Sequence, residues 1–273
     1  MEILKMKFSL KGIIILFIFM FVTGFIVISQ SHAKIDPKTI AGLWLFDESG
    51  KVVKDHSGNG LDGEVIGSVK WVDGKFGKAM EIDGGGGHVK IKDHVNPSEA
   101  ITISAWAKSD GATWNQHGWL VEKRDAYILH NVQGTPNMAF CIVNGAPWNQ
   151  PFAWDTGQVA PKDKDITKWH MYTCTFNSKT GDWKIWIDGE EMSKLACNKA
   201  AIAEDVGPVF IGNDTCCAGR FGAGTVDEVA VFSVELGKAD IQTIYNQGLK
   251  LAALSVGNLD KMSTTWGEVK SVY

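Results

Sequence analysis

Short apolar runs separated by polar turns fill most of the chain. From Ile40 onward, runs rich in Val, Ile, Phe and Trp are divided by Gly, Asp and Asn, a pattern typical of a β-sandwich or barrel. Strands are expected at residues 41–47, 78–83, 88–91, 101–108, 119–123, 127–132, 138–143, 170–177, 183–187, 209–212 and 225–232. The clearest is 183–187, whose side chains would alternate between two faces before Asp188 and Gly189 supply a hairpin turn.

Helical periodicity is confined to one segment near the end of the chain. Residues 238–247 place Ile241, Ile244 and Tyr245 on one face, and Gly248 is positioned to end the helix. Residues 250–273 form a weakly patterned tail that either packs back onto the sandwich or docks elsewhere. Since no repeat of fixed period is visible, repeat arrays and propellers are excluded.

The N-terminus has the pattern of an export signal. Lys5, Lys7 and Lys11 precede an apolar run over 13–28, and small or polar residues follow up to Ala33. We expect residues 1–33 to be a signal peptide cleaved after Ala33, which makes the protein secreted or displayed on the cell surface. The alternative is an uncleaved membrane anchor, because a spanning helix needs only about 20 apolar residues.

Composition and charge narrow the class of protein. The chain has 273 residues, 45% of them hydrophobic and 21% charged, as in folded globular proteins. A formal net charge of -4 provides no basic surface for phosphates, so nucleic acid is excluded as an expected partner. Without the N-terminal segment, the remaining length suits one large all-β domain as well as two small ones.

Several segments, in order, resemble the laminin-G-like domains of secreted bacterial proteins. The most specific match is the loop 55–60 with Gly63 after it, and the opening strand 42–48 precedes it. The other matching segments are 77–84 with 88–91, which resemble a hairpin, then 101–106, 168–172, 186–189 and 226–229. The resemblance implies a laminin-G-like domain over 34–249 with an all-β, concanavalin-A-like jelly roll: two antiparallel sheets with the first and last strands adjacent.

That adjacency predicts a calcium site. Asp55, Ser57 and Asn59 supply the oxygen ligands that calcium prefers, and Asp47 or Asp227 would add a carboxylate from neighbouring strands. Members of the family often hold a structural calcium ion at this loop. The alternative is that Asp and Asn only cap turns through local hydrogen bonds.

Eight of the eleven tryptophans fall into two sets. Those inside strand patterns are assigned to the core: Trp44, Trp106, Trp169 and Trp186. Those in polar or Gly-containing segments are candidates for stacking on a sugar, with Asn149 beside them as a hydrogen-bonding group: Trp114, Trp119, Trp148 and Trp154. The alternative is that long loops fold over the sheet and bury their own aromatic rings.

The five cysteines lack the spacing of a zinc site. In the family fold the segment of Cys197 neighbours the loop of Cys216 and Cys217, so the resemblance implies a disulfide from Cys197 to one of these two. Cys141 and Cys174 either pair with each other or are buried as small hydrophobic residues.

Enzymatic motifs are incomplete. Glu81 and Asp83 are followed by four glycines where a glycosidase of this fold would need another Glu. No serine-hydrolase elbow or zinc-protease helix is present. The expected function is therefore a secreted, calcium-stabilised module that binds a carbohydrate or glycoconjugate without catalysis. The alternatives are a surface adhesion or scaffold protein that binds another protein and, less favoured, a glycosidase.

Overall fold

The structure, a computed structural model, describes residues 35–92, 94, 96–145 and 156–254. The expected signal peptide and the last 19 residues of the tail, 255–273, lie outside this part. Among the residues that the structure describes, no helix has the length and apolar character required to cross a membrane. A 3-10 turn, η1 (Pro37–Thr39), leads into the first strand.

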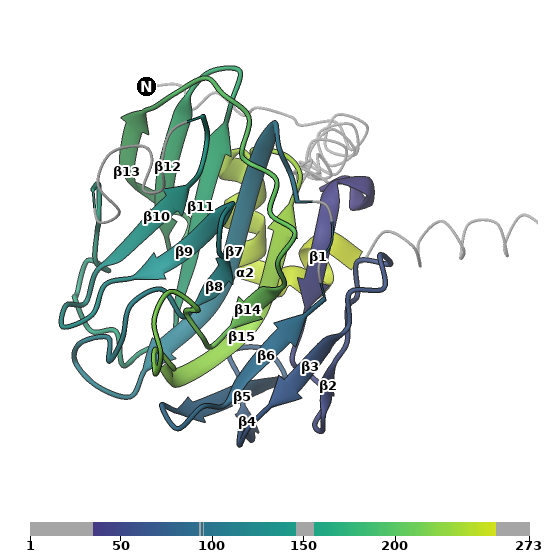
Figure 1. The fold of residues 1–273 in the computed structure, drawn as a ribbon, viewed down its shortest axis with the longest axis vertical. Coiled ribbons are helices and arrows are strands. Elements are labelled where there is room, and N and C mark those ends of the chain that lie inside the picture. The colour runs from purple at the N-terminus through teal and green to yellow at the C-terminus, as the bar shows by residue number, and fades with distance from the viewer. Residues whose placement is uncertain (1–34, 93, 95, 146–155, 255–273) are drawn as a thin grey trace, which may run out of the picture. The chain divides into compact units, whose positions relative to one another are not determined.

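The described strands form two antiparallel sheets (Figure 1). The larger contains β1 (Ile40–Trp44), β4 (Lys70–Asp73), β5 (Lys78–Asp83), β7 (Ala100–Ser109), β11 (His170–Asn177), β12 (Asp182–Ile187), β13 (Glu190–Ala196) and β15 (Ala223–Phe232). The smaller contains β2 (Val52–Val53), β3 (Gly63–Ile66), β6 (His88–Ile91), β8 (Val121–Lys123), β9 (Tyr127–Asn131), β10 (Met138–Ile142) and β14 (Val209–Ile211). The strand order in the larger sheet is β13-β12-β11-β7-β15-β5-β4, with β1 also paired to β15. The order in the smaller sheet is β10-β9-β8-β14-β6-β3-β2. The expected all-β jelly-roll class is confirmed.

Alternation along the strands builds one core between the sheets. In β7, Ile101, Ile103, Ala105 and Ala107 join this core, whereas Trp106 faces the other way and joins a second apolar cluster. A strand with apolar residues on both faces must be covered on both sides. The second face of the larger sheet is therefore covered by other elements.

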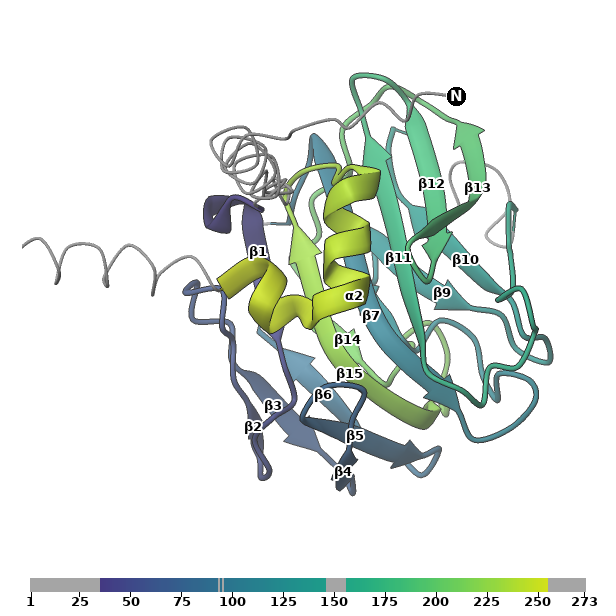
Figure 2. The ribbon, with the colours of Figure 1, turned by 180° about the vertical axis from the view of Figure 1, so that it is seen from behind.

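The helix α2 (Lys238–Leu254) provides that cover, as Figure 2 shows. Ile241 and Ile244 pack with Trp106 in the second cluster, which confirms the predicted apolar face. Gly248 has φ 78° and ψ 163°, so it ends the first helical segment as expected, but a second segment continues to Leu254. The helix therefore continues into the first residues of the segment expected to be a tail.

The two predicted hairpins have different outcomes. Asp188 and Gly189, with φ of 54° and 78°, connect β12 to β13 in the expected tight turn. The segments 77–84 and 88–91 do not pair, because β5 lies in the larger sheet and β6 in the smaller. Four glycines carry the chain between the sheets, and a Cβ at Gly87 would lie 2.1 Å from the carbonyl oxygen of Ser68. A hairpin at this position was therefore a wrong prediction.

Candidate ligand-binding site

The loop predicted to bind calcium is held by its own hydrogen bonds. Oδ1 of Asp55 accepts from the amides of Leu43 and Ser57, at 3.2 and 2.8 Å. Its Oδ2 accepts from the hydroxyl of Ser57 and the amide of Leu61, at 2.8 and 2.9 Å. The side-chain Nδ2 of Asn59 donates to the carbonyl oxygens of Ile40 and Ala41. Both Asp55 oxygens thus fix the turn, as the turn-capping alternative expects, and calcium at this loop stays a prediction.

Asp47 and Asp227 lie instead around the turn between β4 and β5. The amide of Phe76 donates to Oδ2 of Asp227 at 2.9 Å, and the amide of Lys78 donates to Oδ1 of Asp47 at 3.2 Å. The backbone of this turn lies so close to the Asp227 carboxylate that a Cβ at Gly74 would be only 2.6 Å from Asp227 Oδ2. The pairing of β1 with β15 brings the two acids to this turn, as the adjacency of first and last strands predicted.

Asp227 and its neighbour Glu228 are buried acids. Burial raises the pKa of Asp227 to about 8 and that of Glu228 to about 7, and hydrogen bonds from backbone amides only partly offset it. Oδ1 of Asp227 is buried without a hydrogen-bond partner. This oxygen lies near two further acids, Asp47 and Glu228. No three His, Cys, Asp or Glu side chains in the described part of the chain are arranged to hold a metal.

The structure corrects the roles of Trp114 and Trp119. Both side chains are 0% exposed and belong to the core between the sheets. Their rings meet edge to face with centroids 5.6 Å apart, and Gly222 packs directly on Trp119. The segment between β7 and β8 folds inward over its own aromatic rings, so neither ring can stack on a sugar. The other candidates lie outside the described residues: Trp148, Asn149 and Trp154.

The expected disulfide from Cys197 is absent. Cys197, Cys216 and Cys217 are all free thiols in the structure. Cys197 follows β13 at the edge of the larger sheet, whereas the other two lie in the loop after β14 of the smaller sheet. The Sγ atoms of Cys216 and Cys217 lie 3.0 Å apart, so each has the other as its sulfur neighbour. Cys141 and Cys174 are buried, and neither forms a disulfide.

A buried charge network lies on the outer face of the smaller sheet. Glu122 in β8 follows a core valine, Val121, and therefore points away from the core. Its carboxylate accepts from the amide and hydroxyl of Thr215, at 2.7 and 2.9 Å. Burial raises the pKa of Glu122 to about 7. Asp214 is clamped by Arg124 and Arg220, at 2.9 and 2.8 Å.

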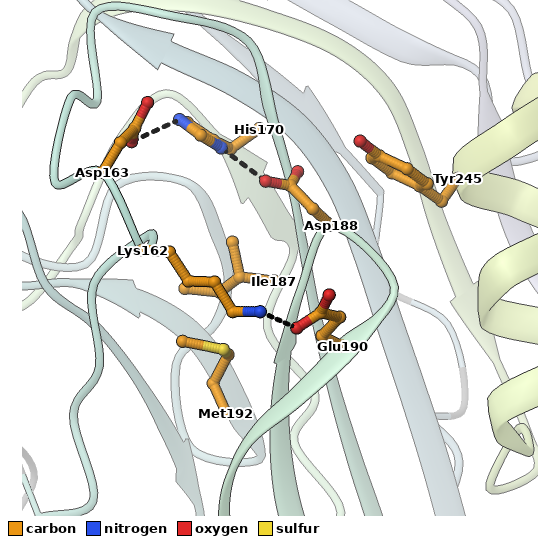
Figure 3. Close-up of a pocket in the computed structure, with 8 residues that line it drawn as sticks. All are labelled: Lys162, Asp163, His170, Ile187, Asp188, Glu190, Met192 and Tyr245. Atoms are coloured by element: carbon orange, nitrogen blue, oxygen red, sulfur yellow. Dashed lines mark hydrogen bonds and ion pairs between the residues drawn. The ribbon is translucent and has the colours of Figure 1, made fainter.

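A pocket of about 370 Å³ opens beside the β12–β13 hairpin (Figure 3). Three separate parts of the chain build it: the segment before β11, the hairpin and α2. Its lining combines acids, a lysine, a histidine and a tyrosine with two apolar side chains: Lys162, Asp163, His170, Ile187, Asp188, Glu190, Met192 and Tyr245. The volume lies within the range of small-ligand sites, about 300 to 1,000 Å³.

His170 fixes one wall of the pocket. Its Nδ1 lies 2.7 Å from Oδ2 of Asp188, and its Nε2 lies 3.2 Å from the carbonyl oxygen of Asp165. Asp188 also accepts from the amide of Met171 at 3.0 Å. Burial lowers the pKa of His170, but the hydrogen bond and charge of Asp188 outweigh burial, and the pKa is raised above 6.5. The wall therefore favours an imidazolium that joins the segment before β11 to the hairpin.

The opposite wall comes from Tyr245 and an exposed ion pair. The ring of Tyr245 stacks on Trp106, with centroids 5.5 Å apart and planes 15° apart. Lys162 forms an ion pair with Glu190, and their side chains are 70% and 55% exposed. Carboxylates accept from hydroxyl groups and an ammonium donates to them, while an aromatic ring covers apolar faces. The pocket can thus bind a polar ligand rich in hydroxyl groups.

Sequence reasoning did not identify this pocket. Only Asp188, as a turn residue, and Tyr245, as part of a helix face, carried a local signal. Lys162 and Asp163 lie in a stretch without periodicity, and the pocket exists because α2 packs against the larger sheet next to the hairpin.

Comparisons with solved structures agree with the fold. The binding domain of Paraclostridial Mosquitocidal Protein 1 matches with 17% identity and a TM-score of 0.58, over 77% of this chain and 52% of that one. Domain 4 of AbnA, an extracellular arabinanase from Geobacillus stearothermophilus, was solved with arabinotriose. It matches with 16% identity and a TM-score of 0.57, over 76% and 98% of the two chains.

A third match is the binding domain of botulinum neurotoxin DC in complex with rat synaptotagmin II, with 14% identity and a TM-score of 0.59, over 77% and 52%. This chain thus spans about half the length of the toxin binding domains. At these identities the likeness shows the fold alone. No curated protein matches the sequence significantly.

A family model also matches residues 83–242, more than half of the 273-residue chain. The segments that resembled laminin-G-like domains fold as two antiparallel sheets with β1 beside β15. The protein therefore belongs to the laminin-G-type family of the concanavalin A-like lectin/glucanase superfamily.

Proposed function

We propose that this protein is a secreted module that binds a carbohydrate or glycoconjugate in the pocket beside the β12–β13 hairpin, without hydrolysing it. The observation that carries the proposal is the convergence of Asp163, Asp188, Glu190, Lys162 and Tyr245 on one space of about 370 Å³. A saccharide presents hydroxyl groups at its edge and C–H groups on its faces, which suits carboxylates beside an aromatic ring.

The relatives support a glycan as the ligand class. Domain 4 of AbnA has the same fold over nearly its whole length and is described with arabinotriose bound. The botulinum domain bound to synaptotagmin supports the alternative, recognition of a protein. Among the described residues, the exposed large hydrophobic side chains are Val52 in β2, Leu251 in α2 and Val206 in the loop before β14. Separate residues favour a glycan pocket over a flat apolar interface.

Binding without hydrolysis is supported by the partners that hold the acids. In the pocket itself, Asp188 is bonded to His170, Glu190 is paired with Lys162 and Asp163 is paired with Lys168. A glycosidase needs one carboxyl group as acid and a second as base or nucleophile, both open to the sugar. Glu122 has a raised pKa suited to an acid, yet it is 0% exposed and bonded to Thr215. The carboxylate of the nearby Asp214 forms ion pairs with Arg124 and Arg220. On the β5 strand, Glu81 pairs with Lys70 at 3.1 Å.

The proposal is tested by screening the protein on a panel of oligosaccharides and titrating the best ligand by calorimetry. We expect Lys162→Ala with Glu190→Gln to weaken binding by about five- to 150-fold, because two polar contacts are worth about 1 to 3 kcal/mol together. The matched control is Lys179→Ala with Glu99→Gln, an equally exposed ion pair remote from the pocket lining. Mass spectrometry of the recovered oligosaccharide should show no shortened product.

Three outcomes would contradict this function. Equal losses in the pocket variant and the control variant would place the ligand elsewhere. Cleaved oligosaccharide would make the protein a glycosidase. If no oligosaccharide on the panel binds and a protein binds saturably, the adhesion alternative is established.

We also propose that calcium stabilises the fold at the turn between β4 and β5. The buried oxygen of Asp227 that lacks a hydrogen-bond partner supports this position, and Asp47 and Glu228 would add negative charge. A cation there would favour the ionised carboxylates and offset their burial. The chain's own amides at Phe76 and Lys78 would continue to hold the turn.

Thermal melts with calcium and with chelator, above the pKa of Asp227, test this site. At about 100 times the dissociation constant, calcium should raise the melting temperature by roughly 5 °C or more. Asp227→Asn should abolish that rise. Asp55→Ala should lower the melting temperature equally in calcium and chelator, because Asp55 fixes its own loop. If Asp55→Ala instead removes the calcium response, the ion binds at that loop.

Secretion is proposed from the basic and apolar pattern of residues 1–33. Expression in a bacterial host with N-terminal sequencing of the exported protein tests it. The expected first residue is Lys34, and recovery of the full-length chain in the membrane fraction would establish an anchor instead.

A further inference from the structure

Cys216 and Cys217 are adjacent in the chain and exposed, with their sulfur atoms 3.0 Å apart. Two sulfurs at this separation need to approach by only about 1 Å to reach the bond length of a disulfide, roughly 2.05 Å. The other cysteines do not compete within this loop: Cys141 and Cys174 are buried, and Cys197 lies after β13 on the opposite sheet.

The loop that carries the pair is fixed at its base. Asn213 and Phe221 form an isolated β-bridge, and the amide of Asp214 donates to the carbonyl oxygen of Arg220 at 3.0 Å. The carboxylate of Asp214 is held by Arg124 and Arg220, and it also accepts from the amide of Cys216 at 2.8 Å. Thr215 is bonded to Glu122 on β8. The two thiols are therefore presented by a closed, anchored loop.

We infer that Cys216 and Cys217 are a redox-active dithiol site that closes to a vicinal disulfide by exchange with a small-molecule disulfide such as oxidised glutathione. The site is distinct from the proposed glycan pocket, because none of the pocket-lining residues belongs to this loop. It therefore goes beyond the proposed function and does not depend on it.

The thiol–disulfide exchange takes place in two steps. One cysteine thiolate attacks a sulfur of oxidised glutathione, forms a mixed disulfide and releases one glutathione thiolate. The second cysteine thiolate attacks the protein sulfur of that mixed disulfide, forms the Cys216–Cys217 bond and expels the second glutathione. The protein loses two protons and two electrons, and one oxidised glutathione becomes two reduced molecules.

The closed form should be easy to reduce. Consecutive Cα atoms are about 3.8 Å apart, shorter than the roughly 4.4 to 6.8 Å usual for disulfide-linked residues. Strained and exposed disulfides are the labile ones. The hydrogen bond with Cys217 and burial raise the pKa of the Cys216 thiol, and the charges of Arg124 and Arg220 only partly offset this. The pair should thus cycle under mild conditions while the anchored base of the loop keeps its shape.

The test is mass spectrometry of the full chain after incubation with oxidised glutathione, with peptide mapping. We expect wild type to lose the mass of two hydrogen atoms at a peptide that contains both cysteines, and to regain it with dithiothreitol. Cys216→Ser and Cys217→Ser should each retain a glutathione adduct on the remaining cysteine. Cys197→Ser is the matched control and should close its 216–217 pair as wild type does.

The mass change of wild type decides whether the 216–217 disulfide forms, so the test does not depend on the variants being folded. A persistent glutathione adduct at Cys216 or Cys217 in wild type would overturn it, as would a disulfide between two protein molecules. A link from Cys197 to either residue would also overturn it and restore the pairing that the family resemblance implied.

Discussion

The imidazole of His170 has an acceptor at each ring nitrogen, Asp188 at Nδ1 and the carbonyl of Asp165 at Nε2. The charged form donates to both, whereas the neutral form can donate to only one. Other charged groups around it are Asp163 at 3.7 Å from Nε2, Lys168 paired to Asp163 and Asp165, and the pocket pair of Lys162 with Glu190. Protonation of one side chain thus secures the pocket wall.

This arrangement predicts a pH-dependent contribution to stability. The folded pKa of His170 is raised above 6.5, so its contribution is fully present below about pH 6 and is lost as pH rises through the folded pKa. Urea unfolding of wild type and His170→Gln should show a difference of about 1 to 2 kcal/mol at acidic pH, shrinking in alkali. Comparing the two proteins cancels the titration of the buried acids they share. A difference that grows with pH would refute this role.

Trp119 shows how residue type alone can mislead. A tryptophan in a Gly-containing segment resembles a sugar-stacking residue, yet its indole packs beneath Gly222 in the core. Trp119→Ala should lower the free energy of unfolding by about 3 to 5 kcal/mol, as for other buried aromatics. Trp119→Phe should retain the fold and bind the glycan as wild type does. Loss of affinity in a folded Trp119→Phe protein would return this ring to the binding site.

Among the elements, the packing of α2 on the larger sheet depends on one glycine, Gly248. Gly248 adopts φ 78° between the two helical segments, and a Cβ there would lie 3.0 Å from both carboxylate oxygens of Glu228. The left-handed conformation is open to glycine at little cost, whereas it strains other residues. The kink therefore lets the second segment pass over the buried acid.

Gly248→Ala should destabilise the protein by at least about 1 to 2 kcal/mol, from the left-handed strain alone. Gly237→Ala is the matched control, because its Cβ would meet only Asp240 at 3.8 Å and its φ is not in the left-handed region. Denaturant unfolding monitored by tryptophan fluorescence measures both. Equal stability of the two variants would mean that the kink is not required for packing.

The strands were predictable because their alternation is local, and the hairpin at Asp188 was predictable because two residues determine it. The partners of β5 and β6 were not, since a glycine run permits both a hairpin and a crossing between sheets. The pocket was also beyond local reasoning, because Lys162, Glu190 and Tyr245 meet only after α2 has packed. The family resemblance supplied the adjacency of β1 and β15 that periodicity could not.

At the scale of the whole domain, the two sheets present different chemistry on their outer faces. The larger sheet carries α2 and the pocket beside its β12–β13 hairpin. The smaller sheet carries Glu122, the arginine clamp of Asp214 and the Cys216–Cys217 loop. A ligand site and a redox site on separate faces can be examined independently, and oxidation of the dithiol should leave glycan affinity within about twofold.

Backbone NMR of the isotopically labelled protein, titrated with the best oligosaccharide from the panel, shows directly whether the glycan binds in the pocket beside the β12–β13 hairpin. If the glycan binds in the pocket, saturable shifts will cluster at Asp163, Asp188, Glu190 and Tyr245, with no change at Glu122 and Phe210 on the smaller sheet. Shifts that centre on Glu122 and Phe210, with the pocket residues unmoved, would contradict binding in the pocket.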